Sequence, residues 1–263
     1  MSRTSWLKIL AGGVISFILL ERVLVATGNI DYVPSLLVVG TVTVPLAFCA
    51  FLYTRARQPD VRLTTLGLCA VWGGVLGTVI AGFLEYHTLL SLGSIPTLAI
   101  GLIEETAKLL VPAYFILTRP YKNESDGIIL GAAAGAGFAV LESMGYGLVA
   151  LLISQGNITA TFQTLLFRAM MAPAAHIAWS GLLGGALWRA KYSPEGGRLR
   201  QFFFTFAGVV LLHALWDSVT FILGYVVLGI VSLSWLIRRV HHAAGRTAAR
   251  RLNVRSIKTH SLL

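Results

Sequence analysis

Three ionisable residues stand close together in an apolar stretch, Ile100-Gly-Leu-Ile-Glu104-Glu105-Thr-Ala-Lys108-Leu-Leu-Val. Each ionisable group near the middle of a membrane helix costs roughly 2.5–3.5 kcal/mol on insertion scales, so such groups usually serve a function. On a helix, Glu104 and Lys108 share a face, whereas Glu105 lies about 100° away around the axis. One carboxylate can therefore pair with the lysine while the other acts as a general base.

Two further apolar stretches contain residue types used in hydrolytic catalysis. Glu142 stands in the middle of the first, and Phe138 lies one helical turn before it and can shield it from lipid or water. His176 stands in the middle of the second and follows Arg168 and Pro173. Because proline has no backbone N–H, Pro173 can bend a helix beside the histidine. Arg168 is a secondary candidate, since its long side chain can reach the outer interface instead.

A fourth apolar stretch contains His213-Ala-Leu-Trp-Asp217. The spacing of four residues puts the imidazole and the carboxylate on one helix face. Asp217 can therefore orient His213, or both side chains can face a water or a metal.

Metal binding is one of two ways in which these residues can activate water. The candidate ligands come from three stretches and would suffice for a three-ligand catalytic zinc with an open water position: Glu142, His176, His213 and Asp217. They are equally suited to a hydrogen-bonded water site without metal. The metalloprotease motif HExxH is absent from the sequence, so we expect no cofactor, with zinc as the alternative.

The elements that position these residues are membrane helices. Of the 263 residues, 56% are hydrophobic and only 12% are charged, and the mean hydropathy is +0.77. This composition is typical of a membrane protein. Windows of about 20 apolar residues predict an all-α, polytopic bundle of eight transmembrane helices. The predicted helices are Ser5–Ala26, Pro34–Tyr53, Leu63–Leu84, Ile95–Thr118, Asp126–Ile153, Phe162–Ala190, Gln201–Thr220 and Phe221–Val240.

The distribution of charge predicts the orientation of this bundle. The net charge is +10, and 18 of the 21 Lys and Arg residues fall in the segments 3–8, 55–62, 119–122, 189–200 and 238–258. Basic residues collect on the cytoplasmic side, so both termini are expected there, in a multi-pass protein of the cell membrane. Topology thus accounts for the charge, and no nucleic-acid partner is expected. We expect one transmembrane domain over 1–240 and a basic cytoplasmic tail over 241–263, with Glu85 in a hydrated outer loop.

The order of the motifs resembles the PrsW family of intramembrane proteases, which is distantly similar to the CAAX prenyl proteases and the bacteriocin-processing membrane enzymes. The motifs are Glu104-Glu105-Thr-Ala-Lys108, Phe138-Ala-Val-Leu-Glu142, His176, and His213-Ala-Leu-Trp-Asp217. The resemblance implies a glutamic-type peptidase that cuts membrane-anchored proteins such as an anti-sigma factor. The larger superfamily more often has Arg, His and Asn where this chain has Lys108, Glu142 and Asp217, so its mechanism does not transfer unchanged.

These residues predict peptide hydrolysis by an activated water. One of the two adjacent glutamates acts as the general base and the other pairs with Lys108. His176 and His213 donate hydrogen bonds to the developing oxyanion, and Asp217 sets the tautomer of His213.

A proton-coupled membrane transporter is the alternative function, because the same buried groups can form a proton relay. The sequence has no inverted repeat or pair of interrupted short helices that would place a transported substrate, which favours the peptidase. We expect a single-pass membrane protein as the substrate and the lipid bilayer as the surroundings. The sequence does not indicate an oligomeric state.

Overall fold

The computed structural model describes residues 2–56, 59–121, 123–192 and 196–260, with side chains as far as Thr247. Within this part of the chain the secondary structure is helical and contains no strand. The elements are α1 (Ser5–Thr27), η1 (Ile30–Tyr32), α2 (Val33–Arg55), α3 (Leu63–Leu92), α4 (Thr97–Thr118), α5 (Glu124–Ile153), α6 (Ile158–Met171), η2 (Ala172–Ala174), α7 (His176–Tyr192), α8 (Arg198–Ser218) and α9 (Ile222–His260). The predicted polytopic helix bundle is therefore confirmed.

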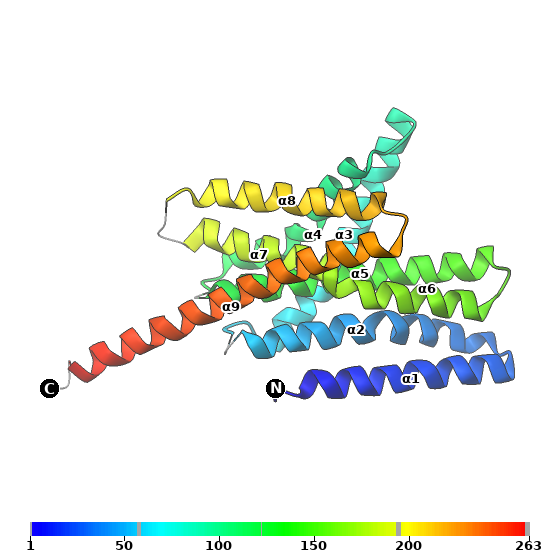
Figure 1. The fold of residues 1–263 in the computed structure, drawn as a ribbon, viewed down its shortest axis with the longest axis horizontal. Coiled ribbons are helices and arrows are strands. Elements are labelled where there is room, and N and C mark those ends of the chain that lie inside the picture. Colours follow the sequence, from blue (N-terminus) through cyan, green and yellow to red (C-terminus); the bar gives the residue numbers. More distant parts are fainter. Residues whose placement is uncertain (1, 57–58, 122, 193–195, 261–263) are drawn as a thin grey trace.

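Six described helices are long and apolar enough to cross a membrane: α1, α2 with η1, α3, α5, α8 and α9. Helix α4 is long enough but carries Glu104, Glu105 and Lys108, which lower its hydropathy. Helices α6 and α7 are each shorter than a membrane span, but together they return the chain from one side of the bundle to the other (Figure 1). The six helices, α4 and the α6–α7 pair thus correspond to the eight predicted passes.

The predicted sixth helix, Phe162–Ala190, is not continuous. The chain leaves the α-helix through the short 3-10 turn η2, and Ala175 has φ −108° and ψ −113°, outside the helical region. Pro173 lies inside this turn, where its missing N–H removes a helical hydrogen bond. A new helix begins at His176, so the break gives this residue an orientation that a straight helix would not.

Helix α5 lies at the centre of the bundle and packs most closely against α7. Its glycines make this approach possible, because a Cβ at Gly135 would lie 2.8 Å from Ser180 Oγ and a Cβ at Gly127 would lie 2.7 Å from Trp188 Cβ. On another face of α5, Gly137 packs against Gly74 of α3. The small residues of α5 thus admit close neighbours on two faces.

Helix α9 does not end at Val240, where the apolar window ends. It continues as one 39-residue helix, and Ala243, Ala244 and Thr247 are buried. Arg246 of this extension and Arg239, just before it, contact the buried Glu124 at the start of α5. The first residues of the expected basic tail, 241–247, are therefore part of a packed helix, because these contacts and the buried alanines hold them against the bundle. Of the predicted tail, residues 261–263 lie outside the described part of the chain.

The start of α1 and the end of α9 lie at the same end of the bundle (Figure 1). Arg55, Lys191 and Arg198, which stand at helix ends, belong to the basic segments that the positive-inside rule assigns to the cytoplasm. The arrangement agrees with an even number of passes. Two basic residues of the topology argument, Arg57 and Lys122, lie outside the described residues.

Candidate active site

Lys108 is the centre of the predicted site and is fully buried. Its Nζ lies 2.6 Å from Glu105 Oε1, 3.1 Å from Glu104 Oε2 and 2.9 Å from His176 Nδ1. An ammonium group only donates hydrogen bonds, so all three atoms act as acceptors. Lys108 therefore contacts both glutamates of its own helix, not one of them, and ties α4 to the start of α7.

The helical register of α4 explains how one lysine reaches two carboxylates. Glu105 and Glu104 precede Lys108 by three and four residues, which are both neighbouring positions on a helix surface. One turn before Glu105, Gly101 lets α8 come close, because a Cβ there would lie 3.2 Å from His213 Cβ. The same turn of α4 thus brings the charged residues to the bundle centre and admits the histidine of α8.

His213 is almost completely buried and faces carboxylates at both ring nitrogens. Its Nδ1 lies 2.9 Å from Glu105 Oε1, and its Nε2 lies 3.6 Å from Glu104 Oε2 and 3.4 Å from Asp217 Oδ2. Glu105, and not Asp217 as expected, makes the short contact that fixes the orientation of the ring. The ring of Trp179 stacks on this imidazole with a centroid distance of 4.8 Å and so restricts its rotation.

His176 connects Lys108 to a second carboxylate, Glu142. With Nδ1 accepting from Lys108, the ring proton lies on Nε2, which is 2.9 Å from Glu142 Oε2. Arg168 Nη2 lies 2.7 Å from the same oxygen, and Arg168 Nε donates to Ser143 Oγ at 3.0 Å. The secondary candidate Arg168 therefore supports Glu142 from inside the bundle, because the break at η2 lets residues on both sides of it reach one carboxylate.

Phe138 packs against the cationic centre of the site. The Nζ of Lys108 lies 4.4 Å from the centroid of its ring, and the ring of His176 lies 5.3 Å away. Phe138 was expected to shield Glu142, but its ring contacts Lys108 and His176 and covers them with an apolar face.

A cavity of about 610 Å³ opens beside these residues. Glu104, Glu142, His176, Arg168 and Asp217 line it, whereas Glu105, Lys108 and His213 do not. The two adjacent glutamates are distinguished by this cavity, because the side chain of Glu104 keeps 9% of its surface exposed and that of Glu105 keeps none.

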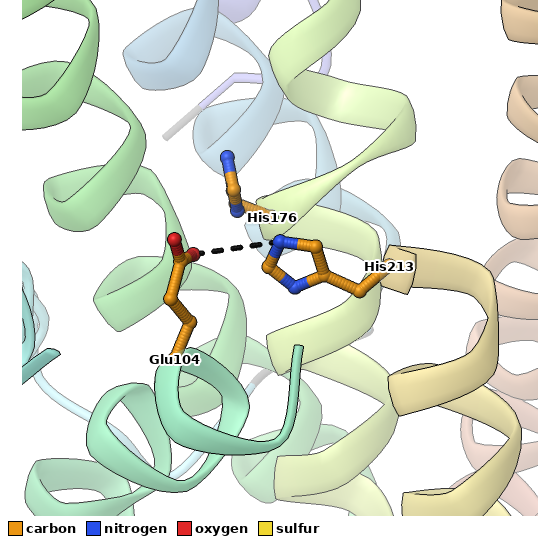
Figure 2. A group of neighbouring side chains, drawn as sticks. All are labelled: Glu104, His176 and His213. Carbon is orange, nitrogen blue, oxygen red and sulfur yellow. Dashed lines mark ion pairs between the residues drawn. The ribbon is translucent and has the colours of Figure 1, made fainter. Parts of the chain in front are cut away.

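Three of the buried side chains have the types and the spacing of metal ligands. Glu104, His176 and His213 each offer one donor atom, and these atoms lie within 4.8 Å of one another. Figure 2 shows the three side chains converging from α4, α7 and α8. Two histidines and one glutamate are a known catalytic zinc set with an open water position. Of the four ligands expected from the sequence, this group keeps the two histidines and contains Glu104 in place of Glu142 and Asp217.

The surroundings of His213 also fit a cation. Its Nδ1–H donates to Glu105, as the second nitrogen of a metal-bound histidine usually does to a carboxylate. Its Nε2 then faces oxygens of Glu104 and Asp217, which only accept hydrogen bonds, so a proton or a metal ion is needed between them. At His176, a metal would take the place of the contact that Nδ1 now makes with Lys108.

Glu85 belongs to the same cavity, although the sequence placed it in a hydrated loop. Helix α3 continues to Leu92, so Glu85 lies within the helix and lines the cavity. A helical pattern could have found it, because Thr78 and Gly82 line the cavity too, seven and three residues before it.

The comparisons with known proteins agree with this site. A family model described as PrsW family intramembrane metalloprotease matches residues 62–238. This region contains each residue of the site described above. No curated protein and no solved structure matches the chain.

Proposed function

Because this chain belongs to the PrsW family of intramembrane metalloproteases, we propose that it hydrolyses peptide bonds of single-pass membrane proteins in the 610 Å³ cavity, with Glu104 as the carboxylate that activates water. The family makes the chain a multi-pass membrane peptidase. The residue roles and the class of substrate are our proposal.

The difference between the two adjacent glutamates supports this assignment best. Glu104 lines the cavity, and its contacts with Lys108 and His213 both use Oε2. The other oxygen points away from His213 in Figure 2 and is available to a water. Glu105 is buried behind it, held by Lys108 and His213. These contacts support Glu104 as the carboxylate that touches reactants and Glu105 as a residue that positions its neighbours.

The proton transfers follow from this placement. A substrate segment in the cavity presents its carbonyl carbon to a water, and Glu104 takes one proton from that water as it attacks. The C–N bond then breaks, and the same carboxyl group returns the proton to the leaving amine. Water adds across the peptide bond, so the products are a carboxylic acid and an amine and no redox partner is needed. If Glu104, His176 and His213 held a divalent metal, it would supply Lewis-acid activation of the scissile carbonyl, and Glu104 would then serve as a ligand instead of as a free general base.

The other site residues keep the reacting carboxylate in one place. Lys108 holds both glutamates and His176, so the ammonium prevents the repulsion that two adjacent carboxylates would otherwise produce. Arg168 holds Glu142, another carboxylate that lines the cavity. Preorganised charges of this kind lower the cost of reorganisation during the reaction.

Comparison of two membrane proteomes tests the proposal and separates it from the transporter alternative. Cells that express the wild type and cells that express Glu104→Gln are compared for new protein N-termini by mass spectrometry. We expect cleaved single-pass proteins in the first sample alone. Asp31→Asn, which removes an exposed carboxylate in η1, is the matched control and should give the wild-type pattern. Identical N-termini in all three samples would refute the peptidase assignment of Glu104.

A further inference from the structure

Glu85 stands out among the carboxylates that line the cavity. Each of the other three has a cationic or imidazole partner: Glu104 contacts Lys108, Glu142 contacts Arg168, and Asp217 contacts His213. Among the described residues, Glu85 has no such contact, and its Oε1 is shielded from solvent without a hydrogen-bond partner. A shielded carboxylate oxygen without a partner is costly, so a partner is expected from outside the described chain.

The charge of the cavity indicates the chemistry of that partner. Of the side chains that the structure describes, four carboxylates line the cavity, from Glu85, Glu104, Glu142 and Asp217, but Arg168 is the single Lys or Arg. A second cation, Lys108, lies behind the lining and is shared by Glu104 and Glu105. The low-dielectric walls of a cavity strengthen the electric field of the charges that line it. The excess of carboxylates therefore favours a positively charged occupant.

Aromatic rings in the same lining favour the same occupant. Tyr225 meets Trp216 edge to face at 5.0 Å and Phe167 at 5.6 Å between ring centroids, and all three rings line the cavity. Aromatic faces attract Lys and Arg side chains and also cover their aliphatic stems.

Glu85 lines the same cavity as Glu104 but belongs to another helix, so it can bind a part of the substrate other than the scissile bond. Glu85 comes from α3, whereas the reacting carboxylate comes from α4, and the residues that hold Glu104 are on α4 and α8. A cavity of 610 Å³ is within the range that holds a drug-sized ligand, so it accommodates a short peptide segment.

We propose that Glu85 is a specificity-determining residue that binds a lysine or arginine side chain of the substrate close to the scissile bond. This inference rests on the proposed peptidase function and adds the class of sequence that the site selects. Glu85 acts by pairing with the substrate and takes no part in proton transfer.

A reporter series tests the inference. The probe is a single-pass membrane protein with an alanine-rich segment next to its transmembrane helix, in which Lys, Gln or Glu is moved through successive positions. With wild-type enzyme, we expect kcat/KM to be about tenfold higher for Lys than for Glu at one or two positions, the size of a charge pair in a partly desolvated site. Glu85→Gln should remove the preference, and Glu85→Lys should reverse it. Asp31→Asn, on an exposed turn, should keep it.

The outcomes separate this inference from the proposed function. Equal rates for the Lys, Gln and Glu reporters with wild-type enzyme overturn the role of Glu85 and leave the peptidase intact. A wild-type preference that persists unchanged in Glu85→Gln also overturns it, even if Glu85→Lys does not fold. Failure to cut any reporter, while Glu104-dependent cleavage of cellular proteins is also absent, overturns both proposals.

Discussion

Glu105 on α4 and His213 on α8 are joined by a contact of 2.9 Å between Oε1 and Nδ1. The carboxylate accepts the Nδ1 proton, which leaves Nε2 directed towards Glu104 and Asp217. Glu105, the neighbour of Glu104 in the chain, thus sets the tautomer of His213. Adjacent glutamates therefore have different tasks, and the predictions below test this division.

Substitution of the two glutamates is expected to give different results. Glu104→Gln keeps the shape of a side chain that faces the cavity, so the protein should fold and lose about 10²-fold or more of its activity, as loss of a general base does. Glu105→Gln leaves Lys108 and His213 with a weaker buried partner and should lower thermal stability in detergent as well as activity. Cleavage of a membrane reporter and the melting temperature are measured for both. Equal loss of stability in the two variants would contradict the division of tasks.

Removal of the buried ammonium should be more damaging than removal of either carboxylate. Lys108→Met strands Glu104 and Glu105 next to each other, and breaking a buried pair costs about 3–5 kcal/mol. We expect little folded protein in the membrane. The double substitution Lys108→Met with Glu105→Gln should recover part of the loss, because the two residues are coupled. Additive effects in the melting temperatures would show that the 2.6 Å contact contributes little.

Metal content decides between the two mechanisms left open by the sequence. If Glu104, His176 and His213 hold a metal, the purified protein contains about one zinc or similar ion per chain, and a strong chelator removes activity that added metal restores. His213→Ala should lose the metal, whereas His87→Ala, which changes an exposed histidine of α3, should keep it. Full activity in chelator, with substoichiometric metal in the wild type, would support the metal-free site that the sequence favoured.

Two glycines of α5 provide a matched test of the bundle packing. A Cβ at Gly131 would run into the Ser180 carbonyl of α7, whereas a Cβ at Gly145 would have no atom within 4 Å. Gly131→Ala should destabilise the protein by about 1–3 kcal/mol, the usual cost of overpacking. Gly145→Ala should be neutral or stabilising by up to about 1 kcal/mol, since alanine favours the helix. Thermal unfolding in detergent measures both, and equal shifts would contradict the close contact of α5 with α7.

The family assignment and most of the helix positions were accessible from the sequence. Apolar windows located the spans because a membrane helix must be apolar over its own length, which is a local property. The ionisable residues within these windows identified the site for the same reason, since each one conflicts with its immediate surroundings. The proline at position 173 also indicated a bend, although not that a new helix would begin at His176.

Contacts between helices decided the roles of the site residues and the ends of two helices. These contacts join segments that are far apart in the sequence, so no single stretch predicts them. The sequence could not distinguish Glu104 from Glu105, since the cavity on one side and the approach of α8 on the other make the difference. It ended α3 before Glu85 and α9 at Val240, where hydropathy falls, although packing carries both helices further. Hydropathy thus determined which segments cross the membrane, and the packing of α4 against α7 and α8 determined which side chain meets which.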